Sequence, residues 1–243
     1  MSILPKNNVD FEVLNYLSSQ ILRNKKINFI SHDTCIGSTI KSGVYWEEWM
    51  LKYISEYYIN GTNMIDLGAN IGTTTLLMSE IISPENKIYS FEPIYHDVTY
   101  MNIIDNNLDD KIKLFPCGVG NKTSTFIFPK VNLNNNINFG ATSIQNCESC
   151  REPSSNEIII PIEKIDNYNF KNISLIKIDV ENMEILVLEG AIDLISEYKP
   201  TIIIETYQYN ELVSSDIFVK LQNLGYSLKE IPEGANDFLL VYK

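Results

Sequence analysis

The sequence predicts an α/β fold built on a mostly parallel sheet, with helices on both faces. Two observations support this. From about residue 61 onward, short apolar segments alternate with segments of helical periodicity, and the chain ends in two strand-like segments joined by a Pro-Glu-Gly-Ala-Asn turn. Strands that alternate with helices pair in parallel through right-handed crossovers, and a final hairpin adds an antiparallel strand. A chain of 243 residues is long enough to bury the core of such a domain.

Residues 1–60 are expected to precede the core as a helix, a hairpin and a second helix. Residues 27–44 alternate irregularly around two glycines, which favours a short hairpin or loop. Residues 46–58 carry a helical apolar face. The first helix is predicted from apolar side chains at every fourth residue, at Val9, Val13, Leu17 and Ile21.

Residues 61–243 are expected to form one domain, with an insertion at about 121–163 that lies over one end of the sheet. The insertion contains an Asn-rich stretch, which is a flexible loop or a substrate lid, and two strand-like runs. The expected strands are Asn63–Leu67, Lys87–Glu92, Lys111–Phe115, Leu175–Val180, Thr201–Glu205 and the two arms of the terminal hairpin. The expected helices are Thr73–Ile82, Asp97–Asn106, Glu184–Ser196 and Ser215–Leu224.

Charge and composition exclude several classes of protein. The net charge of -12 opposes binding to nucleic acid or to an anionic membrane. No apolar run approaches the roughly 20 residues of a membrane span, and the N-terminus lacks a signal-peptide pattern, so we expect a cytoplasmic protein. Cys147 and Cys150 form a lone Cys-x-x-Cys pair, too few ligands for zinc, and all four cysteines are interpreted as free thiols.

The clearest motif follows the first expected core strand, which ends in Asp66. Gly68, Asn70 and Gly72 then form a turn that leads into a helix. Ligands of open α/β sheets bind at such strand ends, where glycines allow close approach and the helix offers unpaired N–H groups. Asn70 stands where a dinucleotide-binding motif has its central glycine, which disfavours a nicotinamide oxidoreductase. The expected ligand contacts from this motif are Asp66, Gly68, Ala69, Asn70, Gly72 and Thr73.

Further carboxylates end the later strands. Glu92, followed by Pro93, ends the second strand, where a carboxylate can accept hydrogen bonds from both hydroxyls of an adenosine ribose. Asp179 falls at the end of the fourth strand and could take a proton from a hydroxyl or help bind a metal ion. Glu181 and Glu205 are expected at the same rim, as weaker candidates for substrate binding.

From about Val44 to Tyr242 the chain resembles the FkbM-type S-adenosylmethionine-dependent methyltransferases, a class I family with a Rossmann-like fold. The motifs that carry the resemblance are Ile65-Asp-Leu-Gly-Ala-Asn-Ile-Gly, Phe91-Glu-Pro, Gly118-Val-Gly, Gly140-Ala-Thr-Ser, Ile176-Lys-Ile-Asp-Val-Glu-Asn-Met-Glu and Val187-Leu-Glu-Gly-Ala. The family usually has glycine where this chain has Asn182, and asparagine tolerates the left-handed backbone that such a turn needs. The resemblance implies a seven-stranded sheet with an antiparallel last strand and adds Gly118 to the cofactor contacts and Ser143 to the substrate candidates.

The resemblance also implies O-methylation of a small molecule or glycan, with a sugar hydroxyl as the first expectation. Asp179 is the expected base. Metal dependence stays open: a lone carboxylate base needs no metal, and Asp179, Glu181 and Glu205 are the expected ligands if the enzyme uses Mg²⁺. Tyr45 and Glu47 either close over the methionine end of the cofactor or belong to the core and a helix start.

Two alternatives stay open. RNA ribose 2′-O-methyltransferases carry a Lys-Asp-Lys-Glu set, to which Asp179 and Glu205 could contribute, but no second lysine is convincing and the net charge is unfavourable. A non-catalytic protein could keep the fold without the chemistry. The sequence does not determine the oligomeric state.

Overall fold

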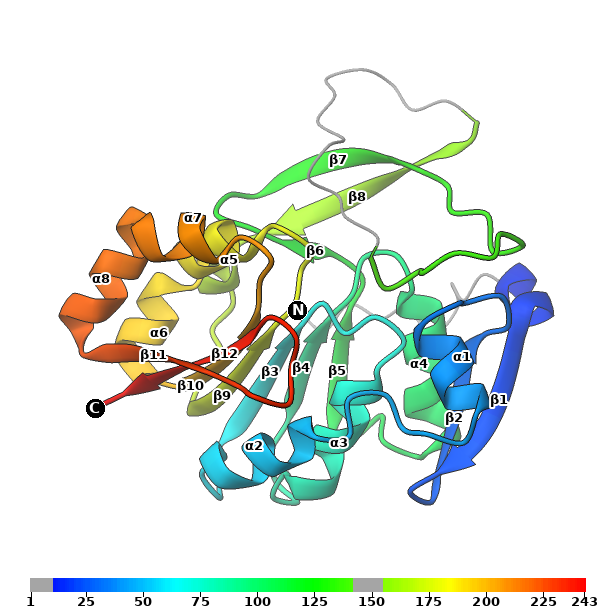
Figure 1. Ribbon diagram of the computed structural model, residues 1–243, viewed down its shortest axis with the longest axis horizontal. Coiled ribbons are helices and arrows are strands. Elements are labelled where there is room, and N and C mark those ends of the chain that lie inside the picture. Colours follow the sequence, from blue (N-terminus) through cyan, green and yellow to red (C-terminus); the bar gives the residue numbers. More distant parts are fainter. Residues whose placement is uncertain (1–10, 142–154) are drawn as a thin grey trace.

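The computed structural model describes residues 11–141 and 155–243, and a seven-stranded sheet forms its centre (Figure 1). The strand order is β11-β12-β10-β9-β3-β4-β5. β12 pairs antiparallel with β10 and β11, whereas the pairs from β10 to β5 are parallel. The predicted sheet with its antiparallel last strand is confirmed. Its strands are β3 (Asn63–Leu67), β4 (Ile88–Phe91), β5 (Ile112–Phe115), β9 (Ile173–Ile178), β10 (Thr201–Glu205), β11 (Tyr226–Glu230) and β12 (Asp237–Tyr242).

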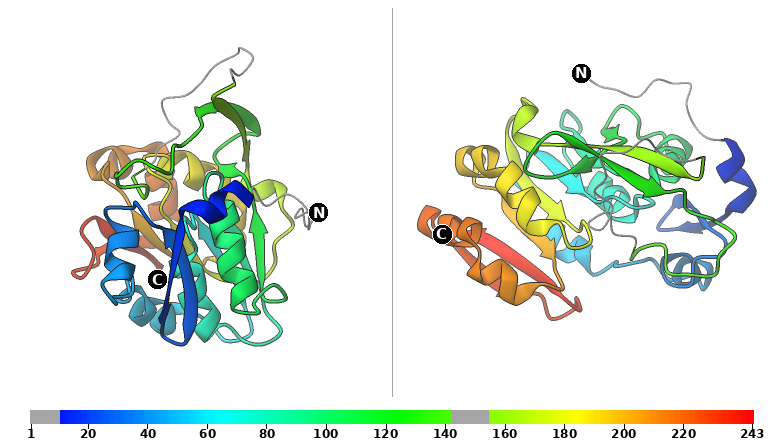
Figure 2. Two further views of the ribbon diagram at one scale, coloured as in Figure 1. Left: turned by 90° about the vertical axis from the view of Figure 1, so that its right-hand side faces the viewer. Right: turned by 90° about the horizontal axis from the view of Figure 1, so that it is seen from above.

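Helices cover both faces of this sheet (Figures 1 and 2), as the sequence predicts. On one face, side chains of α2 (Met50–Tyr57), α3 (Thr73–Ile81) and α4 (His96–Asp105) form a buried cluster with Met64 and Leu175 of the sheet. On the other face, α5 (Glu184–Gly190), α6 (Ile192–Tyr198) and α8 (Asp216–Leu224) pack with Ile65 and Ile176. Because successive strand residues point to opposite faces, β3 and β9 contribute to both clusters.

The N-terminal helix expected from the four-residue spacing is wrong. A 3₁₀ helix, η1 (Phe11–Tyr16), is followed by β1 (Leu17–Leu22), which pairs antiparallel with β2 (Lys25–Ile30). The two residues between the strands, Arg23 and Asn24, both have positive φ, the backbone of a tight hairpin turn. The Arg23 guanidinium also contacts Glu48 and Glu80. The conformation of this turn and the two ion pairs of Arg23 therefore favour a hairpin over the helix that the four-residue spacing predicted.

Two other element predictions also need correction, and one helix was not predicted. Residues 27–44 contain the end of β2 and a helix, α1 (Ile36–Lys41), rather than a hairpin. The expected helix Glu184–Ser196 is divided into α5 and α6, where Gly190 lies so close to the backbone of Gly120 that a Cβ would sit 2.0 Å from its carbonyl oxygen. A short helix, α7 (Tyr209–Ser214), had no clear signal in the sequence.

The insertion forms a small sheet above the carboxyl ends of the central strands (Figures 1 and 2). β7 (Ser124–Pro129) pairs antiparallel with β8 (Glu157–Glu163), which also pairs with β6 (Gly118–Val119). The Asn-rich stretch is attached to the N-terminal region, because Thr34 N donates to Ile137 O at 3.0 Å and Phe139 is fully buried. Ser143, Cys147 and Cys150 lie outside the described residues.

The division into residues 1–60 and 61–243 stays a prediction. Within residues 11–141 and 155–243, each helix is too short or too polar to cross a lipid bilayer.

Candidate active site

The turn after β3 brings two strands into direct backbone contact. Gly68 has φ of 82°, and a Cβ at this position would lie 1.7 Å from the carbonyl oxygen of Asp179, beyond the end of β9. Asn70 and Gly72 also have positive φ, and Gly72 begins α3. The close approach of the ends of β3 and β9 therefore requires glycine at position 68, and the positive φ at the start of α3 favours glycine at position 72.

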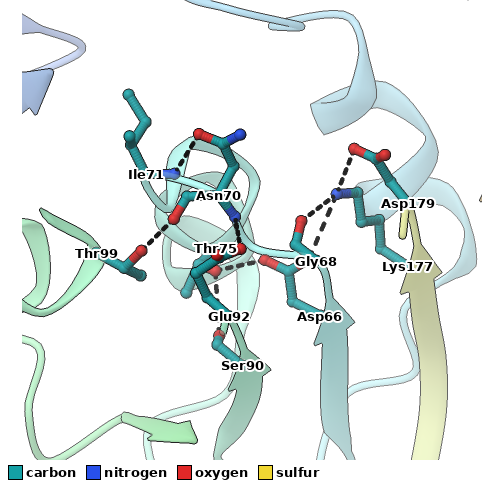
Figure 3. Close-up of polar contacts among 10 residues, drawn as sticks. All are labelled: Asp66, Gly68, Asn70, Ile71, Thr75, Ser90, Glu92, Thr99, Lys177 and Asp179. Carbon is teal, nitrogen blue, oxygen red and sulfur yellow. Dashed lines mark hydrogen bonds and ion pairs between the residues drawn. The ribbon is translucent and has the colours of Figure 1, made fainter. Parts of the chain in front are cut away.

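Asp66 lies beneath this turn (Figure 3). Its carboxylate is fully buried, accepts a hydrogen bond from Thr75 and lies 3.8 Å from Lys177 Nζ. Burial raises the pKa of Asp66, and the Lys177 charge opposes that shift. The structure thus gives Asp66 a supporting position below the turn, and the side chain lines neither of the two clefts described next.

Lys177 is the residue that the sequence analysis missed. Its Nζ donates to the Gly68 carbonyl oxygen at 2.9 Å and to Asp179 Oδ2 at 3.0 Å (Figure 3). Burial lowers its pKa, but the nearby charges of Asp179, Asp66 and Glu47 dominate and raise it above the ordinary value. The signal was a lone lysine in an apolar strand, two residues before Asp179 and so on the same face of the sheet.

The first cleft lies above the ends of β3 and β4. Of the predicted cofactor contacts, it is lined by Gly68, Asn70, Glu92, Pro93 and Gly118. Apolar and thiol side chains that the sequence analysis did not single out complete its walls, among them Phe91, Ile94, Tyr95, Cys117, Val119 and Met183.

Backbone N–H groups surround the Glu92 carboxylate in this cleft. One oxygen accepts from Asn70 N at 2.8 Å, and the other accepts from Ile94 N at 2.7 Å and Tyr95 N at 2.9 Å. Burial raises the pKa of Glu92, and these three hydrogen bonds oppose the shift. Glu92 therefore fixes the turn after β3 against the loop after β4 while its edge faces the cleft.

The second cleft lies over β9 and β10 and is rich in carboxylates. Glu47, Asp179, Glu181 and Glu205 line it, together with Lys177. Burial, the first cause in each case, raises the pKa of Glu47 and of Glu181 to about 7, and that of Glu205 to about 8. The Asp179 charge raises all three further.

The two clefts meet at shared residues: Asn70, Gly140, Asp179 and Glu181 line both. Asp179, the predicted base, therefore stands at their junction. Ala69 and Thr73 line the second cleft, whereas Gly72 lines neither. The turn at Asn182 has φ of 75°, the left-handed backbone expected for the residue that replaces glycine.

The two alternatives considered for Tyr45 and Glu47, a core position or a position over the ligand, have different outcomes for the two residues. Tyr45 is buried and donates a hydrogen bond to Thr73 O at 2.8 Å, which makes it a core residue that supports α3. Glu47 faces the second cleft.

Across residues 11–141 and 155–243, no three His, Cys, Asp or Glu side chains are grouped to hold a metal ion, so the geometry gives no support to Mg²⁺ ligation by Asp179, Glu181 and Glu205.

The model of the methyltransferase FkbM domain matches residues 66–228, which is more than half of the chain. The protein therefore belongs to the FkbM methyltransferase family.

Two individual proteins that the chain resembles have low sequence identity to it. "Methyltransferase sdnD" of Sordaria araneosa is 26% identical over 173 residues, which cover 60% of this chain and 66% of that protein. The crystal structure of Methyltransferase FkbM from Methylobacillus flagellatus KT is 19% identical, with a TM-score of 0.51, over 79% of this chain and 50% of that one. The chain thus spans less than two thirds of either relative, and the solved structure supports the fold alone.

Proposed function

We propose that the protein transfers a methyl group from S-adenosylmethionine to a hydroxyl oxygen of a small molecule or glycan, with a sugar as the first acceptor to test. The observation that carries this proposal is the position of Asp179, which lines both clefts where they meet. A base at that junction is adjacent to a cofactor in one cleft and an acceptor in the other.

The residues of the first cleft fit the cofactor. Gly68 leaves the end of β3 bare of a side chain, Glu92 offers a carboxylate edge to a ribose, and the Ile94 and Tyr95 side chains offer apolar contact to a purine. When bound, S-adenosylmethionine supplies a methyl group already activated by the positive charge of its sulfur.

The protein's own contribution is positioning and proton transfer. Asp179 accepts the proton of the acceptor hydroxyl, a step in which a positioned base typically contributes about 10²–10⁴-fold. Lys177 is a positioning residue, because its ammonium fixes both the Asp179 carboxylate and the Gly68 carbonyl.

The RNA alternative lacks its second lysine. Among the described residues that line the two clefts, Lys177 is the basic side chain, and the overall charge of -12 opposes a polyanionic acceptor.

Methyl-¹³C-labelled S-adenosylmethionine and a panel of sugars, sugar nucleotides and glycans test the proposal. The chemical shift of the transferred carbon distinguishes an O-methyl from an N-methyl or C-methyl product. An O-methyl product, lost in Asp179→Asn, is the expected result; a product methylated at nitrogen or carbon would contradict the proposal.

A further inference from the structure

Two aromatic side chains, Trp46 and Tyr207, line the second cleft. Trp46 precedes α2 and Tyr207 follows β10, so the fold brings them to one cleft from distant parts of the chain. The Tyr207 side chain is 64% exposed, and Trp46 packs only partly against the core. Large aromatic side chains gain free energy when their faces are covered, so rings left open at a cleft offer contact area to a ligand. We call Trp46 and Tyr207 the aromatic wall.

Both residues of the aromatic wall follow a buried, hydrogen-bonded neighbour. Tyr45, directly before Trp46, is buried and donates a hydrogen bond to a backbone carbonyl of α3 at 2.8 Å. Thr206, directly before Tyr207, is buried, and its backbone N–H donates to Asn236 O at 2.9 Å. A binding surface that is ordered before the ligand arrives lowers the entropy that binding costs.

The Tyr207 hydroxyl interacts with Glu205, which also lines the cleft. The charge of Glu205, burial and a hydrogen bond to Glu205 together raise the pKa of Tyr207 to about 12. This interaction holds the hydroxyl while the ring stays exposed. Tyr209 differs, because it is 44% exposed but packs against Phe238, with ring centroids 5.1 Å apart, and lines neither cleft. Tyr207 and Tyr209 therefore form a matched pair for testing a role in the cleft.

The size and polarity of the second cleft limit what the aromatic wall can contact. The cavity has a volume of about 180 Å³, below the roughly 300–1,000 Å³ of pockets that enclose drug-sized ligands, so it suits a single ring. Carboxyl oxygens of Glu47, Asp179 and Glu205 in the same cleft can accept hydrogen bonds from hydroxyl groups. A pyranose carries hydroxyls around its edge and C–H groups on its faces, and the electron-rich face of an aromatic ring attracts such C–H groups. The combination of walls therefore matches a cyclic polyol.

We infer that Tyr207 and Trp46 bind the acceptor and select a cyclic one, by stacking against a face of the ring that carries the methylated hydroxyl. The inference rests on the proposed function. The aromatic wall acts on acceptor binding, whereas Asp179 acts on the proton. An open-chain polyol with similar hydroxyl groups binds less well, because it presents no ring face and loses more conformational freedom on binding.

Pairs of ring and open-chain probes test the inference through initial rates of methyl transfer by the full-length protein. Methyl α-D-glucopyranoside is compared with D-glucitol, methyl α-D-mannopyranoside with D-mannitol, and methyl α-D-galactopyranoside with galactitol. We expect at least one ring to be methylated with a kcat/KM at least about tenfold above that of its open-chain partner. Tyr207→Ala should raise the KM for that ring by about tenfold or more and change kcat by less than about threefold, as expected for lost binding. Tyr207→Phe, which keeps the ring, should retain most of the affinity.

Tyr209→Ala is the matched control and should leave this KM unchanged. Calorimetry should show the same affinity for S-adenosylhomocysteine in Tyr207→Ala, Tyr209→Ala and wild type. Trp46→Ala should also raise the KM, and Trp46→Phe should restore it. A further measurement does not depend on turnover: the chain has two tryptophans, so Trp46 is the single one in Trp49→Phe. Its fluorescence should change on addition of the ring probe and not of the open-chain probe.

Equal kcat/KM values for ring and open-chain probes would overturn the inference, as would equal KM values in Tyr207→Ala and Tyr209→Ala. Methylation of none of the rings by a protein that binds S-adenosylhomocysteine would also overturn it. Loss of S-adenosylhomocysteine binding in Tyr207→Ala would overturn it by assigning Tyr207 to the fold or to the cofactor. O-methylation of an open-chain probe alone would overturn the inference and keep the proposed function, whereas methylation at nitrogen or carbon would contradict the proposed function itself, so the two failures are distinguishable.

Discussion

The two clefts that meet at Asp179 differ in the groups that surround their buried carboxylates. In the first cleft, three backbone N–H groups surround the Glu92 carboxylate. In the second cleft, the nearest positive charge to Glu47 and Glu205 among the lining residues is that of Lys177, which already forms ion pairs with Asp66 and Asp179. Backbone hydrogen bonds thus stabilise the Glu92 carboxylate in the first cleft, whereas Lys177 is the basic side chain among the described residues that line the second cleft.

The difference follows from which groups surround each carboxylate. The loop after β4 turns its N–H groups back toward Glu92, so backbone hydrogen bonds partly offset the cost of burying its charge. At β10 and β12 the surrounding groups are other side chains in register, and these are acidic. Substitutions on each side can therefore separate a carboxylate that backbone N–H groups stabilise from one whose strand neighbour is acidic.

The largest effect on cofactor binding is expected from Gly68→Ala. A Cβ would collide with the carbonyl oxygen of Asp179, so the two strand ends must separate and binding of S-adenosylhomocysteine should fall by about 100-fold or more. The matched control is Gly61→Ala, which has a similar φ and open space around its Cβ, and should cost only about 1–2 kcal/mol of stability. Calorimetry and thermal unfolding compare the two; equal cofactor binding in both variants would contradict the close approach.

Asp179→Asn should reduce methyl transfer by about 10²–10⁴-fold, because it removes the base at the junction of the clefts. Affinity for S-adenosylhomocysteine should stay nearly unchanged, since the backbone carbonyl that contacts the turn remains. Initial rates with the acceptor found by the isotope screen give the measurement. A variant that retains most of its activity would remove Asp179 from the role of base.

The same chemical change should have opposite signs in the two clefts. Glu92→Gln places an amide donor against backbone donors and should lower the free energy of unfolding by about 1–3 kcal/mol. Glu205→Gln relieves repulsion and, near pH 8, should raise the melting temperature of the ligand-free protein by about 2–4 °C. Thermal unfolding of both variants tests this, and a shift of the same sign in both would contradict the contrast between the clefts.

The smallest effect is a change in pH dependence. The folded pKa of Glu205 is about 8 and those of Glu47 and Glu181 about 7, against an ordinary value of 4.5. A carboxyl with a raised folded pKa stabilises the fold at low pH and loses that contribution as the pH rises through the folded value. The advantage of Glu205→Gln over wild type should therefore grow between about pH 5 and pH 8. Parallel stability curves for the two proteins would show that Glu205 does not titrate in this range.

Much of the site was predictable because many of its residues lie at the carboxyl ends of strands that the sequence pattern predicts. The bounds expected for Asn63–Leu67 and Thr201–Glu205 are those observed, so the sequence alone placed Glu205 at the correct rim. Asp237 was not predictable, since its pairing with Glu205 depends on the register of two strands joined through helices and loops. The N-terminal error has a similar origin: four apolar residues suggested a helix, and a two-residue turn with positive φ decided for a hairpin.

Calorimetric titration of the purified protein with S-adenosylhomocysteine, with NAD as the control ligand, tests the central claim most directly. We predict micromolar binding of S-adenosylhomocysteine at one site per chain, no binding of NAD, and a much weaker titration in Gly68→Ala. Absence of S-adenosylhomocysteine binding by the wild-type protein would contradict the assignment of the first cleft as the cofactor site and would favour a protein that keeps the methyltransferase fold without its chemistry.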